Sequence, residues 1–172
     1  MRELPMPPDV SLRPEQPQDF QLVDRLYEAA FGPGRHARTA WRLRGGARHD
    51  PRVSFVAERR GLLVGAIRQS QVTVGGAPAF LLGPLAVAET AAKKGIGSAL
   101  MHHSIAAART TGAHAIVLIG DAPYYRPFGF CEVTVTLPLP WEPHRLLAMA
   151  LTETVSGALL AIPWDEAALG SA

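Results

Sequence analysis

The chain has 172 residues, of which 48% are hydrophobic and 19% are charged, and its formal net charge is +2. This length and composition predict one folded domain, at residues 9–165 between a flexible segment at 1–8 and a tail at 166–172, and exclude a disordered, coiled-coil or collagen-like protein. The small net charge argues against a strongly basic nucleic-acid binder, although it leaves room for a local basic patch.

Residues 10–151 carry alternating strand and helix patterns. In chain order they predict a strand at 10–13, helices at 19–30 and 37–43, strands at 53–58, 62–74 and 79–87, a helix at 95–110, a strand at 115–119, a helical turn at 123–127, and strands at 130–137 and 146–151. The helical segments repeat apolar residues at intervals of three and four, and the strands are short apolar runs. Residues after 151 are expected to be irregular.

The order of these elements predicts how the strands pair. The three consecutive strands between residues 53 and 87 are joined by tight turns, so we expect them to be antiparallel. The strand at 115–119 follows a strand and a helix, so we expect it to run parallel to the strand at 79–87. The whole pattern predicts an α/β (α+β) fold in which helices flank a mixed sheet.

Several simple features bear on location and metal use. The single cysteine, Cys131, cannot form a disulfide within the chain, which is typical of a cytoplasmic, reducing compartment. No apolar run approaches the roughly 20 residues of a membrane-spanning helix, and the first eight residues lack the apolar region of a signal peptide. The histidines show no zinc-binding spacing, so we expect no metal. The absence of a long apolar run also leads us to expect no membrane association.

Two glycines, Gly95 and Gly97, open the helix that follows the buried strand at 79–87. Glycines let a ligand approach the backbone, and the first N–H groups of a helix have no partner within it, so such a helix start suits a phosphate. The only lysines of the chain, Lys93 and Lys94, precede these glycines, where each positive charge opposes the helix macrodipole by about 0.3–1 kcal/mol. A bound anion would reverse that effect, whereas the alternative is two ordinary solvated lysines.

The spacing at this helix start excludes two common nucleotide-binding motifs. A P-loop places its lysine after the glycines, whereas here both lysines come first. A dinucleotide-binding fingerprint needs a third glycine where Leu100 stands, and it follows the first strand of a parallel sheet rather than an antiparallel meander. The phosphate ligand therefore belongs to another class.

Three segments resemble motifs of the GNAT superfamily of acyl-CoA-dependent N-acyltransferases. Residues 92–97, Ala-Lys-Lys-Gly-Ile-Gly, are similar to the signature Gln/Arg-x-x-Gly-x-Gly/Ala, which cradles the CoA pyrophosphate, although Ala92 stands where the family has Gln or Arg. Residues 82–87 and 120–130 resemble the Gly-Pro-Leu-Ala-Val and Tyr-Tyr-x-x-Phe-Gly-Phe motifs of a GNAT subgroup of N-acetyltransferases. The resemblance covers residues 10–137 in element order.

This resemblance implies a mostly antiparallel sheet of six to seven strands, in which the fourth and fifth strands diverge around the pantetheine arm. Pro84 cannot donate to a strand ladder, which fits a bulge in the fourth strand. The implied activity is transfer of an acetyl group from acetyl-CoA to a primary amine by direct attack in a ternary complex. The acceptor would be a small-molecule or peptide amine, and dimers are common in the superfamily.

The resemblance also implies roles for individual residues. The backbone of Leu85, Ala86 and Val87 would pair with the pantetheine amides. The cradle for the pyrophosphate would comprise Lys93, Lys94, Gly95, Ile96, Gly97, Ser98 and Ala99.

Tyr125, four residues before Gly129, matches the family's general acid, whose pKa of about 10 lies above the roughly 8.5 of a thiol. Alternatively, Tyr125 is a structural aromatic residue that packs on a short helix. Residues 31–44 match the acceptor entrance, with Phe31 and Trp41 as candidate substrate-binding residues and four arginines that favour a carboxylated acceptor or form a solvated face.

Some points stay open at this level. Glu58, Glu89 and Asp121 are candidate general bases by position only. One alternative function is a non-catalytic acyl-CoA-binding or regulatory module of the same fold, which Ala92 favours and Tyr125 disfavours. A second alternative is nucleic-acid binding through the arginine-rich residues 35–60, which predicts a strong dependence of affinity on salt.

Overall fold

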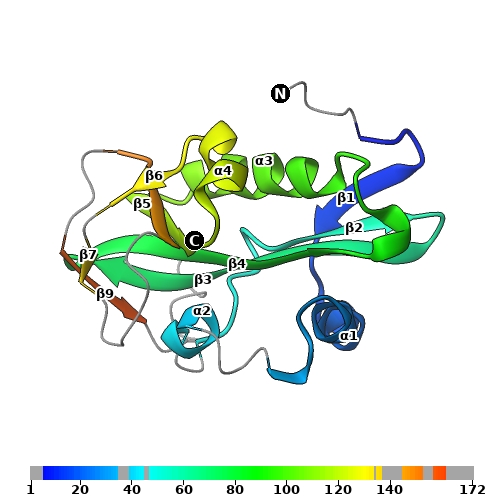
Figure 1. Ribbon diagram of the computed structural model, residues 1–172, viewed down its shortest axis with the longest axis horizontal. Helices are drawn as coiled ribbons and strands as arrows, with labels where there is room; N and C mark the ends of the chain where they lie inside the picture. Colours follow the sequence, from blue (N-terminus) through cyan, green and yellow to red (C-terminus); the bar gives the residue numbers. More distant parts are fainter. Residues whose placement is uncertain are drawn as a thin grey trace.

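The computed structural model describes residues 6–34, 39–44, 47–133, 135–136, 145–152 and 157–161. A sheet forms the middle layer of the molecule (Figure 1). Helices α3 (Ile96–Arg109) and α4 (Ala122–Tyr125) lie on one face, and α1 (Phe20–Phe31) and α2 (Thr39–Leu43) lie on the other. The predicted tail at 166–172 and most of the segment at 1–8 lie outside the described residues, so the proposed domain limits stay predictions.

Seven strands follow one another across the sheet in the order β1–β2–β3–β4–β5–β8–β6. Their bounds are β1 Val10–Pro14, β2 Phe55–Arg59, β3 Leu62–Val74, β4 Ala77–Val87, β5 Ala115–Ile119, β8 Leu146–Ala150 and β6 Cys131–Glu132. Along this path the neighbours are antiparallel except β4 and β5, which are parallel. The predicted mixed, mostly antiparallel sheet is therefore confirmed.

The C-terminal part of the chain differs from the sequence-based prediction. Residues 130–137 do not form one strand, because β6 pairs with β8 while β7 (Val135–Thr136) pairs with β9 (Gly157–Ala161). The expectation that everything after residue 151 is irregular was also wrong, because β9 pairs with the end of β3. β4 occupies one edge of β3, whereas on the other edge β2 pairs only as far as Ile67 and a bridge joins Ser70 to His49, so that edge is open beyond Ser70. The distant strand β9 pairs with this open part of the edge, and local composition does not predict that pairing.

β4 and β5 pair only near their starts, from Ala79 opposite Ala115 to Leu81 opposite Val117. β4 then continues to Val87 along β3, whereas β5 turns away, so one edge of β4 no longer faces a partner in β5. This is the predicted divergence of the fourth and fifth strands, and it leaves backbone groups of β4 directed into the gap.

The predicted bulge also lies in β4. On the β3 side, Gln69 stands opposite Leu82, but Ile67 stands opposite Leu85, so β4 has one residue more than β3 over this interval. Pro84 lies inside the bulge, and the peptide bond before it is cis. A residue that cannot donate a backbone hydrogen bond is thus accommodated where the ladder is already interrupted.

Buried side chains fix helices to both faces of this part of the sheet. The largest apolar cluster packs α3 on the sheet through fully buried residues such as Leu100 and Met101. A buried hydrogen bond of 2.6 Å from Gln69 Nε2 to Ser104 Oγ adds a polar link to α3. On the opposite face, Val23 and Tyr27 of α1 pack in a separate cluster. No helix in the part of the chain that the structure describes is long and apolar enough to cross a membrane.

Candidate active site

The junction between β4 and α3 is a backbone turn that ends at an uncapped helix. After β4, a short 3-10 turn at Glu89–Ala91 leads to Lys93, with φ 59°, and to Gly95, with φ 73°. Gly95 is the N-cap of α3, and no side chain makes a capping hydrogen bond there. Because the first N–H groups of a helix lack partners within it, and because the helix dipole is positive at this end, the junction is suited to an anion.

The residues predicted to bind the cofactor surround this junction. Lys93 and Lys94 are exposed, and the Lys94 ammonium donates to the Thr90 carbonyl oxygen at 3.4 Å. Ile96 is buried in the core and anchors the first turn of α3, whereas Gly97, Ser98 and Ala99 are partly accessible. Of the β4 residues, Leu85 and Val87 pack toward α3, and Ala86 packs toward α1.

α4 brings two tyrosines to the same region. The Tyr124 hydroxyl lies 3.2 Å from the place where a Cβ on Gly97 would stand, so the absence of a side chain at Gly97 lets this ring reach the start of α3. Tyr125 packs over Gly120, at the end of β5, where its ring leaves no room for a Cβ. The two rings meet edge-on with centroids 4.8 Å apart. Tyr124 thus lies at the helix start, and Tyr125 lies at the strand that diverges from β4.

Both phenols stay protonated at neutral pH. Burial, with smaller contributions from the neighbouring Tyr124 and Asp121, raises the pKa of Tyr125 to about 12. Burial also raises the pKa of Tyr124. A protonated phenol is a hydrogen-bond donor, so Tyr125 keeps a donor at the end of β5 throughout the physiological range.

On the α1 and α2 side of the sheet, the bulge of β4 forms one wall of a cavity of about 450 Å³. The Tyr27 hydroxyl donates to the Pro84 carbonyl oxygen at 3.0 Å and ties α1 to the bulge. Further lining residues come from α1, from the segment at 41–49 and from β3: Asp24, Trp41, Arg44, Ala47, Arg48, His49, Arg68 and Ser70. This volume lies within the range of roughly 300–1,000 Å³ that is typical of small-molecule sites.

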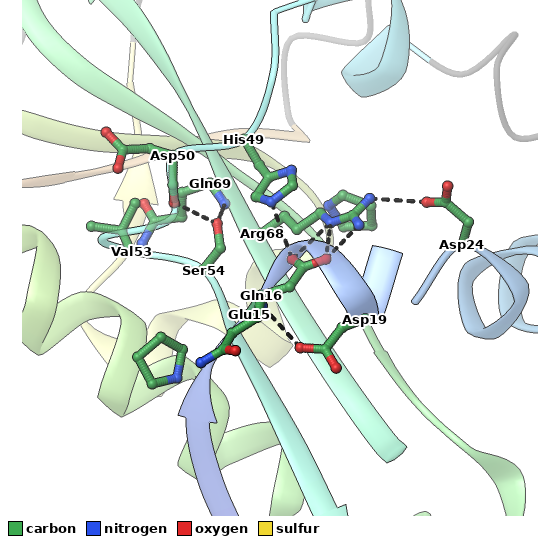
Figure 2. Close-up of polar contacts among 12 residues, drawn as sticks. Glu15, Gln16, Asp19, Asp24, His49, Asp50, Val53, Ser54, Arg68 and Gln69 are labelled. Atoms are coloured by element: carbon green, nitrogen blue, oxygen red, sulfur yellow. Dashed lines mark hydrogen bonds and ion pairs between the residues drawn. The ribbon is translucent and has the colours of Figure 1, made fainter. Parts of the chain in front are cut away.

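One wall of the cavity carries a network of ion pairs around Arg68 (Figure 2). Arg68 Nε donates to Glu15 at 2.9 Å, and its Nη1 donates to Asp24, also at 2.9 Å. His49 Nε2 lies 3.4 Å from the same Glu15 carboxylate. Burial lowers the pKa of His49 to about 4, with a further contribution from Arg68, so this imidazole is neutral at neutral pH.

The two candidate substrate residues differ in position. Trp41 lines the cavity, whereas Phe31 packs against Trp41 and Tyr27 with ring centroids 5.8 and 6.2 Å away. Sequence reasoning missed Tyr27 and Arg68 as site residues, because an aromatic on an apolar helix face and an arginine within a strand carry no local signal of a shared cavity. Of the arginines counted in the segment at 31–44, Arg35 and Arg38 lie outside the described residues.

The three carboxylates proposed as bases occupy other surroundings. Glu58 accepts a hydrogen bond from Arg13 at 2.6 Å on the far strands of the sheet. Asp121 is exposed and lies 3.3 Å from Arg145. Glu89 is exposed on the turn before α3. None of these three carboxylates is among the residues that line the cavity.

Comparison with known proteins gives a consistent result. Residues 20–130 match the acetyltransferase (GNAT) family. The fold is similar to the crystal structure of the GNAT family N-acetyltransferase YhbS from Escherichia coli in complex with CoA, with a TM-score of 0.75 and 23% identity over 90% of each chain. It is also similar to a GNAT family acetyltransferase from Brucella melitensis in complex with acetyl-CoA, with a TM-score of 0.68 and 29% identity over 89% of this chain and 96% of that one.

A third similar structure is the ribosomal-protein-S18-alanine N-acetyltransferase of Escherichia coli, with a TM-score of 0.60 and 18% identity over 84% of this chain and 96% of that one. No curated protein sequence matches this chain.

Proposed function

This chain belongs to the GNAT acetyltransferase family, and we propose that it binds acetyl-CoA along the open edge of β4 and transfers the acetyl group to an amine. The observation that carries this proposal is that β4, whose edge is open beyond its pairing with β5, leads along the chain into the uncapped start of α3. Two similar structures, from Escherichia coli and Brucella melitensis, contain CoA and acetyl-CoA, which supports the same ligand here.

The backbone of β4 is proposed to hold the pantetheine arm. Leu85, Ala86 and Val87 pair with β3 on one edge, and their other edge faces the gap beyond the β4–β5 pairing. An extended chain with two amides can add to such an edge as a further strand does. The pyrophosphate would then lie at Lys93–Ala99. Backbone N–H groups at Gly95 and beyond supply its main donors, so the cradle does not depend on a side chain at Ala92.

The reaction joins the amine nitrogen to the acetyl carbon and breaks the carbon–sulfur bond, with the electron pair leaving on sulfur. The nitrogen loses one proton as it becomes an amide, and the sulfur gains one. The Leu85 backbone N–H is proposed as the donor to the oxyanion that develops at the bulge. The acceptor is proposed to approach from the cavity on the α1 side, whereas Tyr125 acts from the α4 side.

Tyr125 is proposed as the acid that assists the leaving sulfur. With a pKa of about 12 in the free protein, it stays protonated and donates a hydrogen bond to a group whose own thiol pKa is about 8.5. That difference favours stabilisation of the thiolate by the hydrogen bond over complete transfer of the tyrosine proton. The proton that the amine releases is the one that the sulfur finally gains, so the reaction is balanced.

Calorimetric titration with acetyl-CoA and a thiol-release assay on a panel of amines test the proposal. We expect saturable binding and amine-dependent thiol release. Binding without turnover on any amine would instead support the non-catalytic acyl-CoA-binding module. We also propose a cytoplasmic location, because the exposed thiol of Cys131 stays reduced there.

A further inference from the structure

Arg44 is a buried cation in the wall of the cavity. It is 9% exposed, and in the part of the chain that the structure describes its Nε and Nη1 atoms have no hydrogen-bond partner. Its guanidinium lies 5.0 Å from the centre of the Trp41 ring, a cation–π contact that offsets part of the lost hydration. Burial lowers the pKa of Arg44 to about 10, so the side chain is still charged at neutral pH. A buried charge without a counterion is unfavourable, and an anion in the cavity would relieve it.

The other charged groups of the cavity do not supply that anion. Asp24 is already bound to Arg68, and its carboxylate is 61% exposed. Glu15 is fully buried, is not among the residues that line the cavity, and accepts hydrogen bonds from Arg68. The imidazole of His49 is neutral at neutral pH. The positive charge of Arg44 is therefore left to a ligand, whereas that of Arg68 is balanced within the protein.

The guanidinium of Arg44 lies close to the proposed reaction site. Its Nη2 atom lies 3.3 Å from the place where a Cβ on Gly83 would stand, so the guanidinium reaches the β4 bulge beside Pro84. The open edge of β4, where the thioester is proposed to lie, begins at the same bulge. An anionic group bound to Arg44 would hold the rest of a small molecule against that edge.

We propose that Arg44 binds a carboxylate of the acceptor, and that the acceptor is therefore a small amine carrying a carboxylate, such as an amino acid. This inference rests on the proposed transferase function. The guanidinium donors match a planar carboxylate, the rings of Trp41 and Tyr27 supply an apolar wall, and the cavity of about 450 Å³ suits a molecule of this size. The carboxylate fixes the molecule at Arg44 and orients its amine toward the acetyl group.

The experiment compares matched acceptors and matched variants. The acceptors are β-alanine and a set of α-amino acids, each paired with its primary amide, which keeps the amine and removes the carboxylate charge. The variants are Arg44→Met and Arg44→Lys, with Arg25→Met as a control that removes the same charge from an exposed position of α1 outside the cavity lining. Thiol release gives kcat/KM for each pair, and calorimetry gives the affinity for acetyl-CoA.

We expect the carboxylated members to be the better acceptors and Arg44→Met to lower their kcat/KM roughly 10- to 100-fold, as for the loss of hydrogen bonds to a charged group. Arg44→Met should no longer distinguish acid from amide, Arg44→Lys should recover part of the preference, and Arg25→Met should behave as the parent. Affinity for acetyl-CoA should be unchanged in all of them. Equal use of acids and amides by the parent, or equal loss of both in Arg44→Met, would overturn the inference.

The melting temperature separates ligand binding by Arg44 from a purely structural role. A structural role predicts a lower Tm for Arg44→Met, whereas a ligand-binding role predicts an equal or higher Tm, because an uncompensated buried charge is removed. Saturating β-alanine or the best amino acid should raise the Tm of the parent but not of Arg44→Met. Absence of acetyl-CoA binding in every variant would contradict the proposed function itself, whereas acetylation of uncharged amines alone would contradict only the role of Arg44.

Discussion

Tyr124 and Tyr125 are adjacent in the sequence, but their side chains reach different parts of the site. The Tyr124 hydroxyl lies at Gly97 in the first turn of α3, and the Tyr125 ring covers Gly120 at the end of β5. The perpendicular arrangement of the two rings, with an interplanar angle of 88°, follows from this difference. Substitution of each phenol by Phe therefore removes one hydroxyl from one place and leaves both rings packed.

We expect Tyr125→Phe to lower kcat roughly 10- to 100-fold, because a hydrogen bond to a developing thiolate is lost. The affinity for acetyl-CoA should be nearly unchanged, since the ring stays over Gly120. Tyr124→Phe is the matched comparison and should change affinity for acetyl-CoA more than kcat. In the parent enzyme, kcat should not fall between pH 7 and 10 through ionisation of Tyr125, because burial raises its pKa to about 12. Normal turnover by Tyr125→Phe would remove this residue as the acid.

His49 gives a prediction about stability against pH. Burial lowers its pKa from the ordinary 6.5 to about 4, so between these values the unfolded chain binds a proton that the folded protein does not. Stability from this residue is complete above pH 6.5 and is lost as the pH falls toward 4. From pH 7 to pH 5 the loss is up to about 2 kcal/mol. Burial raises the pKa of Glu15, which acts in the opposite direction, so the parent must be compared with a variant.

Urea denaturation of the parent and of His49→Gln at pH 7 and pH 5 isolates this contribution. The parent should lose more stability than His49→Gln on acidification. An equal loss in both proteins would mean that His49 already titrates normally in the folded state.

At the scale of elements, the β4–α3 junction combines an open strand edge with a helix whose start is formed by backbone alone. Gly95, with φ 73°, lets the chain turn into α3 without a capping side chain. The two lysines lie at the surface of this junction. Their effect on a phosphate ligand should therefore be electrostatic and sensitive to salt, whereas the backbone donors supply the geometry.

The double variant Lys93→Ala with Lys94→Ala should weaken acetyl-CoA binding roughly three- to tenfold at low salt. The difference should shrink as salt rises toward 1 M, where the Debye length falls to about 3 Å. Arg25→Ala with Arg42→Ala is a suitable control, since it removes the same charge from exposed positions on the other face. If the lysine variant binds as tightly as the parent at every salt concentration, the glycine cradle acts alone.

On the scale of the whole molecule, the bulge of β4 lies between the helices that cover the two faces of the sheet. α3 and α4 lie on one side of the sheet, and α1 lies on the other (Figure 1). The cavity is lined by residues of α1 and by Pro84 of the bulge. The buried hydrogen bond from Tyr27 to the Pro84 carbonyl oxygen links α1 to this bulge. Loss of that bond should therefore affect both the stability of the fold and the cavity proposed to bind the acceptor.

Tyr27→Phe should lower the free energy of unfolding by about 1–3 kcal/mol, because the buried Pro84 carbonyl oxygen is left without its donor. It should also raise KM for the acceptor more than KM for acetyl-CoA, since Tyr27 lines the cavity and not the β4–α3 junction. Urea denaturation and steady-state kinetics measure the two effects. Unchanged stability would show that another donor reaches Pro84 when the hydroxyl is absent.

Local patterns determined most of the element order. β3 and β5 have the bounds that the sequence predicts, because long alternating or apolar runs between glycine turns define a strand without reference to its partners. The short strands β6, β7 and β9 were misassigned or missed, because their pairing depends on which edges remain open at β8 and β3. Short segments of small residues carry too little local preference to show this.

The sequence by itself determined the fold class, the glycine junction before α3 and the family resemblance, because each depends on residues within a few positions of one another. Only the tertiary structure decided that Arg44 is buried with two unpartnered nitrogens among the described residues, and that Arg68 is neutralised by Glu15, which lies 53 positions away. It also joined Tyr27 to Pro84 across 57 positions. Burial and charge pairing arise from packing between distant segments, so the proposed acceptor side of the site emerged only from the fold.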